Sequence, residues 1–152
     1  MRITKDNINK FIEGSSMDCS NTGITHIEYI PDGITHLYCG VNKLTELPKL
    51  PESLTDLFCG DNRLTELPKL PESLTDLYCG GNRLTKLPNL PNVLKNLECD
   101  ENELVSLPKL PESLISLYCG VNNNLPYDIT IDNIKQHNTL IKRKQILKRI
   151  CG

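Results

Sequence analysis

The sequence lacks the motifs by which many enzymes, metal proteins and membrane proteins are recognised. Its 152 residues include no tryptophan, and no G-x-S-x-G, H-E-x-x-H or glycine-rich phosphate loop occurs. No two cysteines form a C-x-x-C pair. No apolar stretch approaches the roughly 20 residues of a membrane span, and the apolar part of the N-terminus is too short for a targeting signal. We therefore expect no enzymatic activity, cofactor, metal site or membrane span.

What the sequence has instead is a repeat. Its period is 20 residues, which is typical of proteins built from stacked units. The unit Leu54–Ser73 reads LTDLFCGDNRLTELPKLPES, and residues 46–65 and 66–85 agree at 18 of 20 positions. Six of the seven cysteines mark the period: Cys19, Cys39, Cys59, Cys79, Cys99 and Cys119. We expect about five strand-bearing turns over residues 14–125, an N-terminal cap over 1–13 and a C-terminal helical cap over 126–152, all in one structural domain.

Each unit predicts a short strand followed by an extended return. Leu57 and Cys59 alternate with Asp56 and Phe58, which indicates a strand with one buried side. The return is too short for a helix, and its two prolines favour an extended left-handed conformation. The predicted fold is an α/β-type repeat solenoid, mostly β. It has a parallel concave sheet, a polyproline-like convex side, a short helical N-terminal cap and a C-terminal capping helix.

The two ends of the chain depart from the repeat. Ile8, Phe11 and Ile12 have helical spacing, and Asp6 or Asn7 is placed to cap that turn. Residues 129–150 also change to a helical period. One helix, or two helices with a break near residue 138, fits this segment, and we expect it to lie over the last repeat.

Two columns of the repeat are assigned structural roles. Disulfides or a metal site were weighed for the six cysteines, but parallel side chains at strand spacing and the lack of a histidine in phase favour six buried, reduced thiols. Such a row indicates an intracellular compartment, the cytoplasm, which would be a host cytoplasm for a viral protein. The second column should bind turn backbone groups, and its members are Asn42, Asn62, Asn82, Asn102 and Asn122.

The exposed strand positions are the predicted partner-binding surface. Aromatic side chains recur there, as is common in interface hot spots, although aromatic ladders also stabilise sheets by themselves. The predicted contacts are Tyr38, Asp56, Phe58, Asp76, Tyr78, Glu98, Asp100, Glu101, Glu103 and Tyr118. The acidic residues from 98 to 103 either contact a basic partner or a cation, or form a solvated edge with Glu103 paired to Arg83. The solvated edge is the favoured interpretation.

The C-terminal segment is basic. Six Lys and Arg residues between 135 and 149 face only Asp128 and Asp132. A solvated helix face with cations near the C-terminus of the helix explains this charge more simply than nucleic-acid binding, since no aromatic residues are interleaved for base stacking. Cys151 follows the basic run and is either reactive or part of a frayed end.

The units LTELPKLPESLTDLYCGGNRL resemble the short, roughly 20-residue class of leucine-rich repeats. That class is familiar from secreted effectors of bacterial pathogens, some of which carry a ubiquitin-ligase domain after the repeats. The L-x-C-G-x-N variant and the Ile/Asn/Lys-rich tail look still more like leucine-rich repeat proteins of giant viruses. The resemblance implies protein binding through concave positions such as Thr55, Asp56 and Phe58. No segment has the length of a ligase domain or an F-box, so we expect only the recognition half of such a system.

The function predicted from the sequence is therefore a non-enzymatic protein–protein interaction module that binds protein partners through its concave face. Two alternatives stay open. One is a self-associating structural component, for example of a viral particle, and the near-identity of the middle copies favours it slightly. The other is binding of nucleic acid by the basic C-terminal helix.

Overall fold

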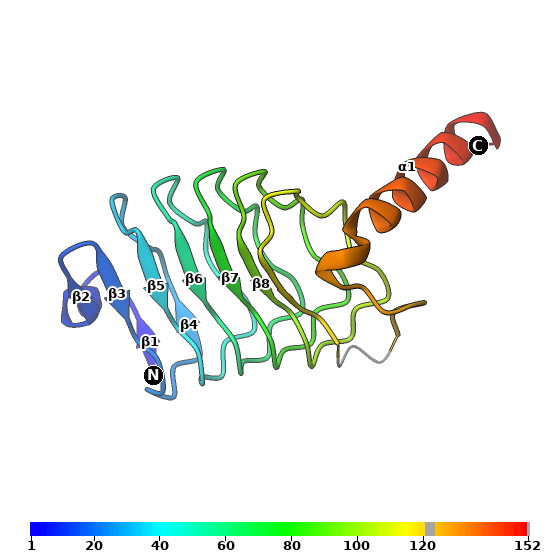
Figure 1. Cartoon of the computed structure of the whole chain (residues 1–152). Coiled ribbons are helices and arrows are strands. Elements are labelled where there is room, and N and C mark those ends of the chain that lie inside the picture. The colour runs from blue at the N-terminus through cyan, green and yellow to red at the C-terminus, as the bar shows by residue number, and fades with distance from the viewer. Residues whose placement is uncertain (121–123, 152) are drawn as a thin grey trace.

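The computed structural model describes residues 1–120 and 124–151 as one solenoid with a projecting C-terminal helix (Figure 1). Its main sheet has seven strands in the order β2-β3-β5-β6-β7-β8-β9. The bounds are β2 (Ile12–Glu13), β3 (Ser16–Asp18), β5 (His36–Tyr38), β6 (Asp56–Phe58), β7 (Asp76–Tyr78), β8 (Asn96–Glu98) and β9 (Ser116–Tyr118).

The strands from β3 to β9 are parallel, and each pairs with its neighbour in a register of 20 residues. In the described residues, the main sheet thus contains six parallel strands, β3 and β5–β9, where the sequence predicted about five. The additional strand is β3, in which Met17 pairs with Leu37 and takes the same buried position. The repeat fold predicted from the sequence is confirmed.

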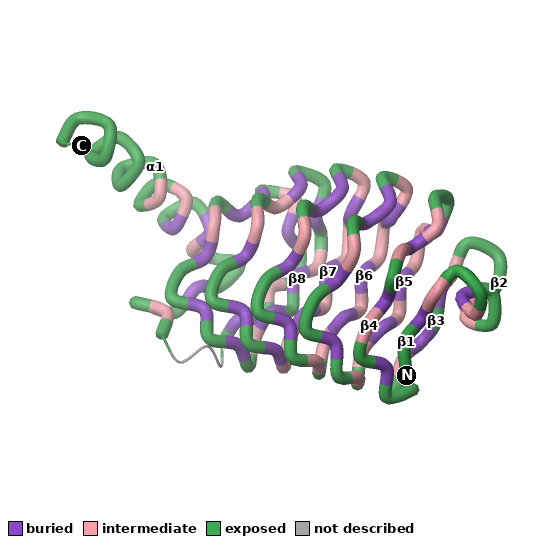
Figure 2. Tube along the Cα trace, turned by 180° about the vertical axis from the view of Figure 1, so that it is seen from behind, coloured by how far each residue is buried: buried purple, intermediate pink, exposed green. Residues whose placement is uncertain are grey.

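The strands are short because the repeat alternates sides for only a few residues before it turns. In β6, Leu57 is fully buried while Asp56 and Phe58 are partly exposed. The return segments are extended, as their prolines favour, and contain no helix in the described repeats. Leucines from the strands and the returns form one continuous core along the solenoid. Buried positions recur in successive turns of the chain (Figure 2).

Gly40, Gly60 and Gly80, which follow cysteines, lie where neighbouring turns approach each other closely. Gly60 lies close to the next turn, where an added Cβ would be 3.1 Å from the carbonyl oxygen of Gly80. The left-handed conformation falls one residue later in the five copies whose turn the structure describes. The residues that adopt it are Asn21, Val41, Asp61, Gly81 and Glu101.

The N-terminal cap contains the helical turn that the sequence predicted, together with two short strands that it did not. The only helical part in the described segment is the 3-10 helix η1 (Ile8–Phe11). Strand β2 pairs antiparallel with β3, and β1 (Arg2–Ile3) pairs with β4 (His26–Ile27) on the opposite side of the core. Asn7 does not cap η1 with its side chain, because its Oδ1 accepts a hydrogen bond from the Thr4 backbone N–H at 2.9 Å.

The C-terminal segment forms one continuous helix, α1 (Ile134–Cys151), after a 3-10 turn, η2 (Ile131–Asn133). No break occurs at Asn138. Its side-chain amide instead donates to the carbonyl of Leu110 and accepts from the Leu110 N–H, both at 2.8 Å. Only the start of α1 packs on the last repeat, through Ile134 and His137. The rest extends away from the stacked turns, so the predicted cap covers less than expected (Figure 1). Among the described residues, no helix has the length and apolarity to cross a bilayer.

Candidate functional site

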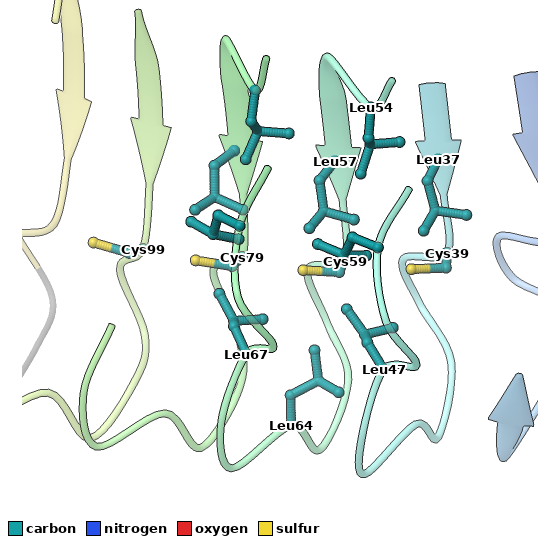
Figure 3. Packing of buried hydrophobic residues seen from close by; sticks show 14 of the residues in the cluster. Leu37, Cys39, Leu47, Leu54, Leu57, Cys59, Leu64, Leu67, Cys79 and Cys99 are labelled. Carbon is teal, nitrogen blue, oxygen red and sulfur yellow. The ribbon is translucent and has the colours of Figure 1, made fainter. Parts of the chain in front are cut away.

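The six periodic cysteines lie in one row inside the solenoid, which we call the cysteine column. All six side chains are buried, and no disulfide joins any of the seven cysteines in the part of the chain that the structure describes. The sulfur atoms of Cys39, Cys59, Cys79 and Cys99 point the same way in neighbouring turns (Figure 3). Burial raises the pKa of Cys59 to about 12. Burial, followed by repulsion from the neighbouring thiols, also raises the pKa values of Cys39 and Cys79. The thiols are therefore neutral at physiological pH and unsuited to nucleophilic chemistry.

The asparagines bind backbone groups of two successive turns. The Nδ2 of Asn82 donates to the carbonyls of Cys59 and Cys79, both at 3.1 Å, and its Oδ1 accepts from the Leu64 N–H at 3.0 Å. Asn42, Asn62 and Asn102 repeat this pattern, while Asn122 lies outside the described residues. In the first copy, Thr22 donates to the Cys19 carbonyl at 2.6 Å.

The solvent-facing side chains of β3 and β5–β9 form what we call the sheet face. Its most ordered feature is the aromatic stack of Tyr38, Phe58 and Tyr78 on three adjacent strands. The ring centroids of Tyr38 and Phe58 are 4.8 Å apart, and those of Phe58 and Tyr78 are 4.4 Å apart with planes only 7° from parallel. Glu98 takes the next position and ends the stack. Tyr118 therefore stands apart on β9, with 67% of its surface exposed.

Carboxylates line the stack on its strand-start side. Asp56 lies 3.5 Å from the His36 ring nitrogen and accepts a hydrogen bond from the Thr55 hydroxyl. Asp76 accepts from the Thr75 hydroxyl and from the amide of Asn96, both at 2.6 Å. Hydrogen bonds thus hold both carboxylates in fixed positions beside the rings.

The predicted acidic cluster divides into two parts. Glu98 and Asp100 converge near the α-carbon of Gly80, beside the end of the aromatic stack. Partial desolvation, followed by repulsion from Asp100 and Asp61, raises the pKa of Glu98. Burial and the neighbouring carboxylates likewise raise the pKa of the Tyr78 hydroxyl.

The other two acidic residues lie on the turns. Glu101 and Glu103 are exposed there, and no salt bridge joins Glu103 to Arg83 in the described residues, contrary to the pairing expected from the sequence. Asp61 was missed by the sequence reasoning. It lies in the turn after β6, at the position that Gly81 takes in the next copy.

The three histidines are separated from one another. His26 lies 3.7 Å from Glu46, and His36 lies on the sheet face. His137 is buried, with Nδ1 2.9 Å from the Tyr127 hydroxyl and Nε2 2.9 Å from the Pro108 carbonyl. Within residues 1–120 and 124–151, no three His, Cys, Asp or Glu side chains are placed to hold a metal ion.

Comparison with known proteins places this architecture among bacterial effector domains. No family model matches the chain, and no curated protein matches its sequence. The leucine-rich repeat domain of a Shigella effector is similar in structure, with a TM-score of 0.69 and 34% identity over 76% of this chain and 52% of that one.

Two forms of YopM are also similar. The leucine-rich effector YopM from Yersinia pestis gives a TM-score of 0.66 and 36% identity over 73% of this chain and 31% of that one. YopM from Yersinia enterocolitica gives 0.61 and 32%, over 68% and 25%. The chain thus spans about half of the Shigella domain and less of the others, and the expected similarity to giant-virus proteins stays a prediction. The fold, the period of 20 residues and these similarities together identify the chain as a leucine-rich repeat protein of the short-repeat type that occurs in bacterial effectors.

Proposed function

We propose that the chain is a non-enzymatic module that recognises a protein partner through its sheet face. The observation that carries this proposal is the aromatic stack of Tyr38, Phe58 and Tyr78, which stands on the solvent side of the sheet between fixed carboxylates. Aromatic rings supply large contact areas at a low cost in side-chain entropy, and they are enriched in interface hot spots. The similarity to effector domains supports the same class of function.

The size and charge of the sheet face define the partner that fits it. Six strands at about 4.8 Å spacing give a strip roughly 24 Å long, and three residues per strand make it roughly 10 Å wide. Such a strip accommodates one extended peptide or one helix of a partner. Asp56, Asp76, Glu98 and Asp100 make it acidic, so the favoured partner presents Lys or Arg side chains beside an apolar surface.

The test is selection of peptides from a displayed random library against the immobilised full chain. The double substitution Phe58→Ala/Tyr78→Ala should reduce the affinity of the selected peptides by at least about tenfold, because truncation of a hot-spot residue commonly costs more than 2 kcal/mol. Lys49→Ala/Lys69→Ala on the exposed convex side is the matched control. Unchanged binding by the aromatic variant, or equal loss by the control, would show that partners bind elsewhere.

The cysteine column favours a reducing compartment such as the cytoplasm as the location of the protein. In an oxidising compartment, six adjacent thiols would be open to oxidation whenever the solenoid unfolded locally. Full reduction of the protein isolated from its native cells, measured by counting free thiols under denaturing conditions, is the expected result. Disulfide-linked species in such an isolate would contradict this placement.

A further inference from the structure

The projecting helix α1 has two apolar sides, and only one of them is packed. At 100° per residue, Ile134, His137, Asn138 and Ile141 lie on the side that faces the last repeat. The exposed side carries four apolar residues within an arc of about 120°, an arc that they share with Gln136, Thr139 and Arg143; we call these four residues the apolar stripe. Its members and their exposed fractions are Leu140 (40%), Ile146 (45%), Leu147 (59%) and Ile150 (74%).

This helix is also strongly cationic. Six of its 18 residues are Lys or Arg, and it contains no Asp or Glu. The sheet face has the opposite charge, with Asp18, Asp56, Asp76 and Glu98 on it, Asp100 beside its edge, and Lys10 and Lys95 as neighbouring cations. The two surfaces are therefore complementary in charge, because one is cationic and the other carries carboxylates. They are also complementary in apolar character, because the stripe on the helix matches the aromatic stack on the sheet face.

The dimensions of the two surfaces agree as well. A helix of 18 residues is about 27 Å long and about 10 Å wide with its side chains. The sheet face is a strip of roughly 24 by 10 Å. Helices with i, i+3, i+4 and i+7 apolar anchors are a common ligand for such surfaces.

The helix cannot reach the sheet face of its own chain. Its base is fixed to the convex side, because His137 bonds the Pro108 carbonyl and Asn138 bonds the backbone of Leu110. From there it extends away from the stacked turns (Figure 2). Pairing of two such helices from different copies would bring six cations against six, which electrostatic repulsion disfavours.

From these observations we propose that α1 of one copy lies along the sheet face of a second copy. The contact joins two different surfaces, so it is a head-to-tail contact, and it can propagate into longer chains of molecules. The proposal rests on the proposed role of the sheet face in binding and adds a specific occupant, a cationic amphipathic helix of the same chain.

The test uses two full-length variants that each keep one of the two surfaces. The first has a disabled helix, Lys144→Glu/Leu147→Glu, and both substituted side chains are exposed, so folding should be unaffected. The second has a disabled sheet face, Tyr78→Ala/Glu98→Lys. Lys49→Glu/Lys69→Glu on the convex side serves as the control. It lowers the net charge of the protein by more than Lys144→Glu/Leu147→Glu does. Circular dichroism checks that each variant is folded.

Sedimentation velocity from micromolar to millimolar concentration gives the outcome. The wild type and the convex control should form oligomers that grow with concentration, and each surface variant alone should be monomeric. An equimolar mixture of the two surface variants should form a one-to-one dimer and grow no further, because only one helix and one sheet face remain functional.

Three results would overturn the inference. One is a monomeric wild type at all concentrations, and another is a mixture that does not pair. The third is flotation of the wild type with vesicles of phosphatidylserine and phosphatidylcholine, without self-association, since the occupant of the helix would then be an anionic membrane. If library peptides still bind the wild type and fail to bind Phe58→Ala/Tyr78→Ala, the proposed function stands even where this inference fails.

Discussion

The cysteine column should make the protein sensitive to alkali. In the native state, burial raises the pKa of Cys59 to about 12 from a reference of 9.0, and the pKa values of the other five periodic thiols are raised as well. Unfolding brings every thiol into water, where it ionises near its reference value. A group with a raised native pKa stabilises the fold fully below its unfolded pKa, and this contribution is lost as pH rises toward the native pKa.

The size of the effect follows from linkage. At pH 10, each unfolded thiol gains about 1.4 kcal/mol from ionisation that the buried thiol does not gain. For the five thiols from Cys19 to Cys99 the total is about 7 kcal/mol, which is comparable with the whole stability of a typical domain. We therefore expect urea midpoints to fall steeply between about pH 8 and about pH 10.

The assay is urea unfolding followed by circular dichroism, in the presence of a phosphine reductant that keeps the thiols reduced. The variant Cys59→Ala/Cys79→Ala should start from a lower stability, because it loses buried volume. It should then lose about 3 kcal/mol less than the wild type over the same pH range, because it lacks two titrating thiols. Tyrosine and lysine titrate equally in both proteins and cancel in the difference. Parallel pH profiles for the two proteins would refute a dry row of thiols.

Three further outcomes are expected. Asn82→Ala should lower the free energy of unfolding by about 3 kcal/mol, because it leaves buried backbone groups of two turns unpaired; Asn92→Ala on the exposed convex side is the control, and equal urea midpoints would contradict this role. Glu98→Gln should raise stability at neutral pH and have no effect below the unfolded pKa of Glu, because the pKa of Glu98 is raised in the fold; a less stable Gln variant at neutral pH would be contrary to this sign. His137→Ala should speed amide hydrogen exchange in α1, because it removes the bonds to Tyr127 and Pro108, and protection in β5–β7 should not change; exchange that rises equally everywhere would count against a local anchor.

The central fold could be predicted from the sequence because equivalent positions in successive copies carry residues of the same type, so each position is predicted several times over. Leu57, Leu77 and Leu97 occupy one buried position, and Phe58 and Tyr78 occupy one partly exposed position. A period that repeats without insertions brings equal positions together whatever the details of each turn. The stacking of the aromatic residues follows from the same register.

The ends of the chain could not be predicted in the same way, because each contact there occurs once. Nothing periodic marks the pairing of Arg2 and Ile3 with His26 and Ile27. A break near Asn138 was one of two possibilities that the sequence left open, but the Asn138 amide bonds the Leu110 backbone and lies within one continuous helix. Asp61 was overlooked for a related reason, since its place near Glu98 depends on how the turns stack and not on strand alternation.

The asparagine bonds also give the solenoid a direction of growth. Each amide reaches back to the carbonyl of the turn before it, as Asn82 does to Cys59 and Asn62 does to Cys39. Thr22 stands where no earlier copy exists, and it bonds only its own turn through its hydroxyl. A duplicated unit inserted after residue 42 would contain its own asparagine, whose amide would bind the backbone of the preceding turn. A unit added in front would find a threonine where it needs an asparagine, so gene duplication can lengthen this protein toward its C-terminus far more readily than toward its N-terminus.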